Sequence, residues 1–147
     1  MKDTGKRSTP LIIGWREHVG LPDFNIERLR AKIDSGARTS ALHATKIEPF
    51  TRDGEAWVRF LPAHSKTSGR QFAEFRVHDQ RSITNTSGIP ESRIVIRTRL
   101  SIKNRSWNIE LSLTDRSMMK YPMIIGRSAL RDHNVAVHLG RSFIVKK

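Results

Sequence analysis

The sequence contains no cysteine. A disulfide framework, a thiolate zinc site and a cysteine nucleophile are therefore excluded. Long hydrophobic runs are also missing: the first apolar run, Leu11-Ile12-Ile13, is too short for a signal-peptide core or a membrane span, and Gly14 and charged residues follow it. These absences predict a soluble, cytoplasmic protein in a reducing compartment, with no membrane among its partners.

Acidic residues are few relative to basic ones. Lys and Arg number 27 against 14 Asp and Glu, so the formal net charge is +13. Such a field attracts polyanions or acidic polypeptides, although a solvated basic surface is the simpler interpretation. Aromatic residues make up only 7%, with a single Tyr, whereas nucleic-acid modules usually carry stacking aromatics on the binding face. An acidic polypeptide is therefore the favoured partner, and nucleic acid ranks last.

The length of 147 residues suits one domain with a buried core. Residues 1–10 are polar and basic, and we expect them to form a disordered tail. A single domain is then predicted for residues 11–147.

Alternation of apolar and polar residues predicts a fold made of strands. One apolar face is expected along Ile94, Ile96, Thr98, Leu100 and Ile102. Residues 107–113 repeat the pattern, so the two segments form a hairpin that turns at residues 103–106. An earlier hairpin is indicated by Asp53-Gly54, because this dipeptide tolerates the positive φ of a tight turn.

Shorter segments complete the predicted architecture. Strands are expected at residues 71–78, 135–139 and 142–145, the last two forming a closing hairpin around Gly140. Residues 128–133 read as a short helix, and residues 25–30 fit a helix or a strand equally well. The pattern as a whole indicates an all-β barrel or sandwich with one short helix near the C-terminus.

A carboxylate followed at once by a turn marks a candidate site at Asp34-Ser35-Gly36. The preceding residues Leu29, Ala31 and Ile33 form the inward face of a strand that delivers Asp34, and Gly36 permits a sharp exit with close backbone approach. The triplet is a weak motif by itself, and Asp3-Thr4-Gly5 matches it in the polar terminus by chance. Asp34 alone could simply cap its own turn, as Asp commonly does.

A second segment, residues 122–130, gives the triplet its context: an apolar strand ends in Gly126-Arg127 and runs into the predicted helix. Together the two segments resemble the retropepsin-like aspartic proteases. The sequence is also similar, segment by segment, to the bacterial family labelled ATP-dependent zinc protease; the similar segments are Gly14–Glu17, Ala31–Ala44, Trp57–Phe60, Glu91–Ile96 and Met119–Arg127. The resemblance implies a closed retropepsin-like barrel and an aspartic endopeptidase activity.

The cofactors in that family label find no support among the motifs. No Gly-x-x-x-x-Gly-Lys-Ser/Thr loop is present to hold ATP. No His-Glu-x-x-His is present, and the six histidines show no zinc-ligand spacing. Gly-x-Ser-x-Gly is also missing, which excludes the usual hydrolase elbow. We therefore expect no cofactor and no metal.

Peptide hydrolysis by paired acids needs two carboxylates that share a proton across one water. The sequence supplies one credible loop, so the second carboxylate must come from an identical chain, and we expect a homodimer with Asp34 at the two-fold interface. The resemblance implies that Asp34 is catalytic and is supported by nearby residues. The same resemblance implies that Ser35 braces the opposing loop, that Gly36 admits close approach, and that Gly126 lies beneath the loop with Arg127 anchoring it. Ala37 belongs to the expected set of supporting residues.

One position departs from the viral retropepsins. They carry an acid two residues after the glycine, whereas this sequence has Arg38, so Arg127 is expected to pair with Asp132 or Asp115 instead. If Arg38 lies near Asp34, its charge favours the ionised carboxylate and activity at acidic pH. The flap that covers substrate in the viral enzymes has two candidate turns here, residues 64–69 and 85–90. Each is equally compatible with an ordinary surface loop.

Two functions from different classes remain open. The first is a dimeric aspartic endopeptidase that acts on acidic or glutamate-extended polypeptides, a substrate class suggested by the charge and by the links of the resembled family to glutamate-ligase systems. The second is a catalytically silent domain that uses the same barrel to bind an acidic protein partner. His43 could reach the site, but a hydrogen-bonded or exposed histidine is the simpler interpretation.

Overall fold

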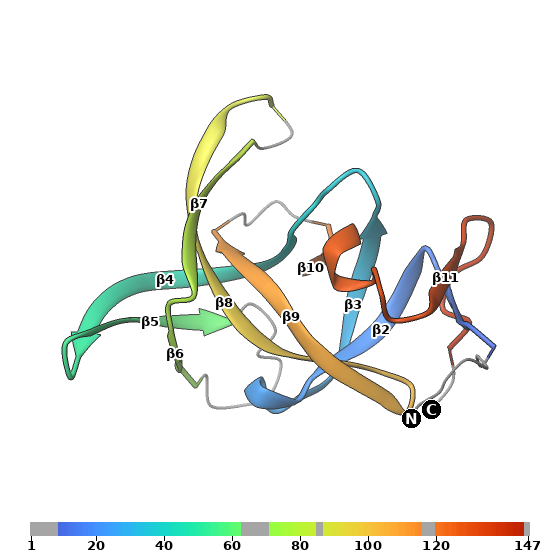
Figure 1. Ribbon diagram of the computed structural model, residues 1–147, viewed down its shortest axis with the longest axis horizontal. Coiled ribbons are helices and arrows are strands. Elements are labelled where there is room, and N and C mark those ends of the chain that lie inside the picture. The colour runs from blue at the N-terminus through green and yellow to red at the C-terminus, as the bar shows by residue number, and fades with distance from the viewer. Residues whose placement is uncertain (1–8, 63–70, 85–86, 116–119, 146–147) are drawn as a thin grey trace.

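The computed structural model describes residues 9–62, 71–84, 87–115 and 120–145. Its centre is a closed ring of six strands, taken in the order in which they pair: β10 (Met123–Gly126), β3 (Ile26–Asp34), β2 (Arg16–Leu21), β8 (Pro90–Ile102), β9 (Arg105–Thr114) and β4 (Ser40–Arg52). Pairing of β10 with both β3 and β4 closes the ring. The predicted all-β closed barrel is therefore confirmed (Figure 1).

Further strands extend from this ring. β5 (Glu55–Pro62) and β6 (Ala73–Arg76) continue the sheet outward from β4, and β7 (Asp79–Thr84) pairs with β8 as a long projecting hairpin (Figure 1). β1 (Leu11–Gly14) and β11 (Val135–His138) form a separate parallel pair. Helical structure within the described ranges is limited to two 3-10 turns, η1 (Pro22–Phe24) and η2 (Arg127–Ala129). Neither turn is long and apolar enough to cross a membrane.

The strand alternation predicted from sequence places the core. On β8, Ile96, Thr98, Leu100 and Ile102 are buried, whereas the intervening Arg97 and Arg99 are exposed. The β8 and β9 side chains pack with those of β2, β3, β4 and β10 in one cluster inside the ring. Two-residue periodicity was a reliable guide here because this part of β8 has one face on the core and one in solvent.

Both predicted tight turns are confirmed. Asp53 and Gly54 join β4 to β5 with φ values of 52° and 77°. β8 and β9 are joined by Lys103 and Asn104 alone, a tighter turn than the four residues expected. The strand predicted at residues 71–78 is shorter, Ala73–Arg76, and β7 follows it unpredicted, since its polar sequence shows no apolar face.

Two predictions near the ends of the barrel need correction, and one open alternative is settled. Val135–His138 pairs in parallel with β1, and residues 142–145 form no strand, so the closing hairpin around Gly140 is absent. The short C-terminal helix is a single 3-10 turn over Arg127–Ala129. Residues 26–30 belong to β3, which settles the ambiguous segment as a strand. Residues 1–8 of the predicted tail lie outside the described residues.

The segment mistaken for a strand is held by a buried carboxylate. Glu17 is fully buried, and its Oε2 accepts hydrogen bonds from the backbone N–H groups of Gly14 at 2.7 Å, Ile144 at 2.9 Å and Val145 at 3.2 Å. Gly14 permits the close approach, because a Cβ there would lie 2.6 Å from the carbonyl oxygen of Arg141. Glu17 therefore supplies the acceptor that a partner strand would otherwise provide.

We expect Glu17→Gln to lower the free energy of unfolding by about 2 kcal/mol, because the amide NH₂ would face backbone N–H donors and leave buried groups unsatisfied. Urea denaturation at pH 7 measures this. Glu27→Gln is the matched control, since Glu27 is exposed on β3 and should change stability little. Equal stability of the two variants would show that the Glu17 contacts contribute nothing net.

Candidate active site

Asp34 lies at the last position of β3, where the barrel strand turns into an exposed loop. Its Oδ1 accepts a hydrogen bond from Gly36 N–H at 3.0 Å, and its backbone oxygen accepts one from Ala37 N–H at 3.1 Å. A Cβ on Gly36 would lie 3.3 Å from Oδ1, so glycine lets the backbone approach the carboxylate. The turn thus presents an exposed acid on a rigid strand end.

β10 supports this loop from below. The parallel register sets Gly126 opposite Asp34, and the Gly126 N–H donates to Ser40 Oγ at 3.0 Å. A Cβ at Gly126 would lie 2.8 Å from the carbonyl carbon of Thr39 and 2.9 Å from the carbonyl oxygen of Ala37. Only glycine allows the strand and the loop to pass this closely.

Arg127 ties the next step of the chain to the same loop. Its guanidinium Nη1 donates to the backbone oxygens of Ser35 at 3.2 Å and Gly36 at 3.3 Å. Its backbone N–H donates to Ala37 oxygen at 2.8 Å, and the N–H of Ser128 donates to Arg38 oxygen at 3.1 Å. The side chain and backbone of one arginine thus hold three consecutive carbonyl groups.

The prediction that Arg127 pairs with an acid is wrong. Within the described ranges Arg127 makes no ion pair, with Asp132, Asp115 or any other acid. Loop carbonyls take the acid's place, because they already lie within reach of the guanidinium and match its N–H donors. Arg38 is exposed, and no ion pair joins it to Asp34 in this part of the chain.

The structure therefore brings all six predicted site residues together, Asp34, Ser35, Gly36 and Ala37 from the loop and Gly126 and Arg127 from β10 and η2. Their catalytic and dimer-bracing roles stay predictions, since they concern chemistry and a second chain. His43 is half-buried on β4, and its Nδ1 lies 3.3 Å from the backbone oxygen of Thr114, which fits the structural interpretation.

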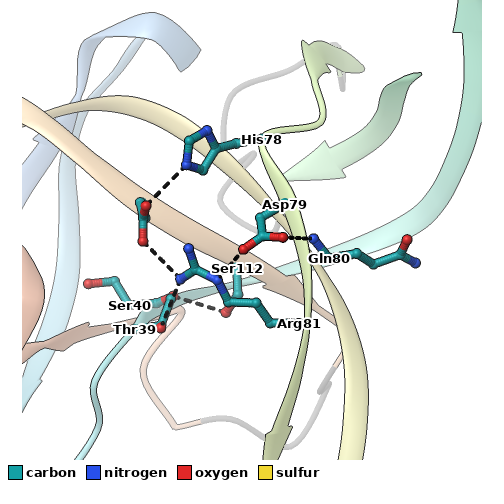
Figure 2. Close-up of polar contacts among 8 residues, drawn as sticks. Thr39, Ser40, His78, Asp79, Gln80, Arg81 and Ser112 are labelled. Carbon is teal, nitrogen blue, oxygen red and sulfur yellow. Dashed lines mark hydrogen bonds and ion pairs between the residues drawn. The ribbon is translucent and has the colours of Figure 1, made fainter. Parts of the chain in front are cut away.

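Residues that the sequence did not reveal connect β7 to the loop. Arg81 on β7 bonds Asp79 Oδ2 through Nε at 2.6 Å and Glu110 Oε1 through Nη1 at 2.8 Å. The same Nη1 lies 3.5 Å from Thr39 Oγ1, at the end of the Asp34 loop (Figure 2). His78 Nε2 lies 3.1 Å from Glu110 Oε2. The β7–β8 hairpin, which carries the flap candidate at residues 85–90, is thus anchored beside the candidate site; residues 85–86 and the other candidate, 64–69, lie outside the described residues.

This network shifts the titration of its members. The hydrogen bond from Arg81 holds the pKa of the Glu110 carboxyl below its ordinary value. In return, the hydrogen bonds to Glu110 and then to Asp79 raise the pKa of Arg81. A carboxyl with a lowered folded pKa stabilises the fold above its ordinary pKa, and the stabilisation is lost as pH falls through the lowered value. The anchor of the β7–β8 hairpin should therefore weaken only in acid.

We expect Glu110→Gln to be less stable than the native chain at pH 7, with the difference closing as the pH falls below the ordinary carboxyl range of about 4. Urea denaturation at stepped pH measures the difference. Glu55→Gln is the control, because Glu55 forms an exposed pair with Arg76 at 2.7 Å, a kind that contributes little. A Glu110→Gln difference that does not change with pH would contradict the assignment.

The label of the resembled family names zinc, which needs a cluster of donor side chains. Within the described ranges no group of three or more His, Cys, Asp or Glu side chains is arranged to hold a metal ion. The donor set therefore does not fit zinc there, and no chemical step is assigned to it. A groove of about 750 Å³ is present at the opposite end of β3, and Asp34 does not line it.

Comparison with known proteins agrees with this geometry. Residues 12–147 match the family described as "Retropepsin-like aspartic endopeptidase RimB". The chain belongs to this family. The resemblance inferred from the Asp34 and Gly126-Arg127 segments is thereby confirmed, and the match covers the whole barrel, including the closing segment held by Glu17.

The curated relatives of this chain are longer proteins. Two proteins named "Probable alpha-L-glutamate ligase", from Desulfotalea psychrophila and Parasynechococcus marenigrum, are 42% and 43% identical to this chain over 123 residues. The match covers 82% of this chain but only 26% of each relative, so the chain spans about a quarter of their length. Their name describes the longer proteins.

A solved structure has the same fold. The crystal structure of Lpg0085 from Legionella pneumophila, a protein described as of unknown function, matches with a TM-score of 0.77 and 29% identity, over 92% of this chain and 98% of that one. The barrel fold of this chain is therefore supported by an independent structure.

Proposed function

We propose that the chain is an aspartic endopeptidase whose active form is a homodimer with the two Asp34 carboxylates facing each other. The observation that carries the proposal is the exposed Asp34 at a strand end, with its loop held from below by Gly126 and Arg127. Membership of a retropepsin-like family supports the same activity. One chain supplies one such loop, so two-fold association completes the acid pair.

The chemistry follows from a shared proton. The ionised Asp34 takes a proton from a water molecule, whose oxygen attacks the peptide carbonyl carbon, while the protonated Asp34 of the second copy donates to the carbonyl oxygen. The tetrahedral intermediate then collapses: the C–N bond breaks as the first Asp34 gives the proton it took from water to the amide nitrogen, while a hydroxyl of the intermediate returns a proton to the second Asp34, releasing an amine and a carboxylic acid. Both carboxyl groups must lie within hydrogen-bond reach of one water.

We infer that the substrate is an acidic polypeptide, with glutamate-extended tails as the first candidate. The net charge of +13 favours encounter with negative chains. The relatives that contain this domain within longer proteins are named as glutamate ligases, and a ligase makes the kind of chain that such a peptidase would cut. Both observations point to the same substrate class.

The test is hydrolysis of a peptide that ends in several glutamates, followed by mass spectrometry from pH 3 to pH 8. We expect internal cleavage within the acidic segment and little cleavage of the matched peptide with glutamines. The chain should sediment as a dimer under the conditions where it cleaves. Absence of cleavage at every pH, with a folded dimer, would contradict the proposal.

One observation favours the alternative of a silent binding domain. The Asp34 carboxylate accepts the Gly36 N–H, so it also stabilises the turn in which it lies. An acid with this structural role could persist in a barrel that only binds an acidic partner. Binding of the glutamate peptide without cleavage would support this second function.

A further inference from the structure

Ion pairs are distributed unevenly over the barrel. In the described part of the chain every ion pair lies outside β2 and β3: the cations are His78 and arginines on β4 to β8. The Glu17 carboxylate on β2 is buried and bound to backbone N–H groups. The exposed cations on the outer face of β2 and β3 are therefore not neutralised by ion pairs within the described ranges.

The cations of this face form a line that leads to Asp34. Arg28, Arg30 and Lys32 are exposed on β3, at alternate positions before Asp34. The β2 register sets Arg16 opposite Lys32 and His18 opposite Arg30. We call Arg28, Arg30 and Lys32 the cation row. Its members are about 6.6 Å apart along the strand, the spacing of side chains on one face of an extended peptide.

Neutral rings position these cations without cancelling their charge. The Arg30 guanidinium lies 4.9 Å from the ring centre of Tyr121, and the Lys32 ammonium lies 6.0 Å from that of Trp15. Arg16 donates to Tyr121 Oη at 2.9 Å, and this bond holds the pKa of Tyr121 below its ordinary value, as a positive surface would. The third member, Arg28, has its Nη2 3.3 Å from His18 Nδ1. None of these contacts is with an acid, so the cation row is available to an anion.

A groove opens at the far end of the row, where β2 and β3 form a β-bulge. Val19 pairs with Leu29 and Leu21 with Ile26, so Gly20 alone faces both Glu27 and Arg28, and both of these side chains point outward. A Cβ on Gly20 would lie 3.2 Å from the Glu27 backbone oxygen, so glycine lets the β2 and β3 backbones lie close together beneath the groove. The groove, of about 750 Å³, is lined by His18, Arg28, Lys103, Glu27 and Phe143 among others. Its cations outnumber its single acid.

We propose that this groove and the cation row form a second site, which anchors an acidic stretch of polypeptide and directs it along β3 toward Asp34. Asp34 lies six positions after Arg28, so about 20 Å of extended chain leads from the start of the cation row to Asp34. The anchoring itself needs only the charges of this face. Delivery to Asp34 rests on the proposed function, with the cleaved bond lying beyond the anchored stretch.

The occupant is a polypeptide rather than a nucleic acid because of the rings on this face. Single-stranded nucleic acids need open aromatic faces for base stacking. Here the Arg16 guanidinium covers Trp15 at 4.3 Å, and the Phe143 ring lies 4.7 Å from that of His18. Carboxylates need only the charges and the alternate spacing that the cation row provides.

The test measures fluorescence anisotropy of a labelled ten-glutamate peptide with the full chain carrying Asp34→Asn, which prevents cleavage. We expect Arg28→Gln/Arg30→Gln/Lys32→Gln to weaken binding by about tenfold and to flatten its salt dependence. The matched control, Arg52→Gln/Arg59→Gln/Arg76→Gln, removes the same charge from strands whose arginines are paired, and should change affinity less than about threefold. If circular dichroism shows that the triple variant is misfolded, the single variant Arg28→Glu replaces it in the binding measurement.

Equal weakening by the two triple variants would overturn the second site in favour of a diffuse net-charge effect. Tighter binding of a uridine oligonucleotide than of the peptide would also overturn it, in favour of nucleic acid. With Asp34 intact, the cation-row variant should raise KM and leave kcat near its native value. Cleavage with unchanged KM would refute the second site alone, whereas peptide binding without any cleavage would refute the proposed function alone.

Discussion

Replacing Asp34 by asparagine is expected to lower peptide cleavage by about a thousandfold or more while the barrel stays folded. Asparagine has nearly the same shape, and its side-chain oxygen can still accept the Gly36 N–H that Oδ1 accepts at 3.0 Å. It cannot take a proton from water at any working pH, so the acid pair is lost from both subunits of the dimer. Initial rates on the glutamate-ended peptide measure the change.

Thermal melting and sedimentation provide the control for Asp34→Asn. The side chain is exposed and makes no ion pair within the described ranges, so the melting temperature and the dimer should be nearly unchanged. Asp53→Asn is a matched variant, because Asp53 is an exposed acid in the turn between β4 and β5, and it should keep native activity. Native activity of Asp34→Asn would leave Asp34 with its capping role only.

Gly126→Ala is expected to lower the free energy of unfolding by about 3 kcal/mol and to remove cleavage with it. The new Cβ would lie within 2.8 to 2.9 Å of the backbone of Thr39, Ala37 and Arg38, closer than real contacts allow. Backbone atoms cannot rotate away as a side chain can, so either β10 or the Asp34 loop must shift. Urea denaturation and cleavage rates on the same preparation measure both effects.

Gly140→Ala is the control for this prediction. A Cβ at Gly140 would meet only the His138 ring, at 3.4 Å, which is an ordinary contact with a movable side chain. Stability and activity should both stay close to native. If Gly126→Ala retained full activity with native stability, the loop would not depend on the close crossing by β10.

The barrel could be predicted from the sequence where a strand has one buried face and one solvent-exposed face. Arg97 and Arg99 alternate with buried Thr98 and Leu100, and this local pattern directly encodes β8. Residues 142–145 misled the same reasoning, because the backbone N–H groups of Ile144 and Val145 donate to the Glu17 carboxylate and not to a partner strand, and Glu17 lies more than 120 positions earlier in the sequence. Periodicity reports which side chains are buried, and it does not report which group satisfies the backbone.

The candidate site divides in the same way. Asp34 and Gly126-Arg127 carry local signals, a strand that ends in a turn and a strand that ends in a glycine, and their resemblance to a known family placed them together. Arg81 and Glu110 carry none, because their ion pair joins two strands 29 positions apart at 2.8 Å. The prediction of an acidic partner for Arg127 was wrong because the acceptors are the backbone carbonyls of Ser35 and Gly36. A sequence identifies charged side chains, but it does not indicate which backbone carbonyls lie within reach.

Mixing native and Asp34→Asn subunits tests the central claim most directly. The two are combined at constant total concentration, exchange is verified with differently tagged chains, and cleavage is measured against the native fraction. If each active centre needs one Asp34 from each subunit, mixed dimers are inactive and the cleavage rate follows the square of the native fraction. A linear dependence would show that a single chain carries the complete site, and would contradict the account.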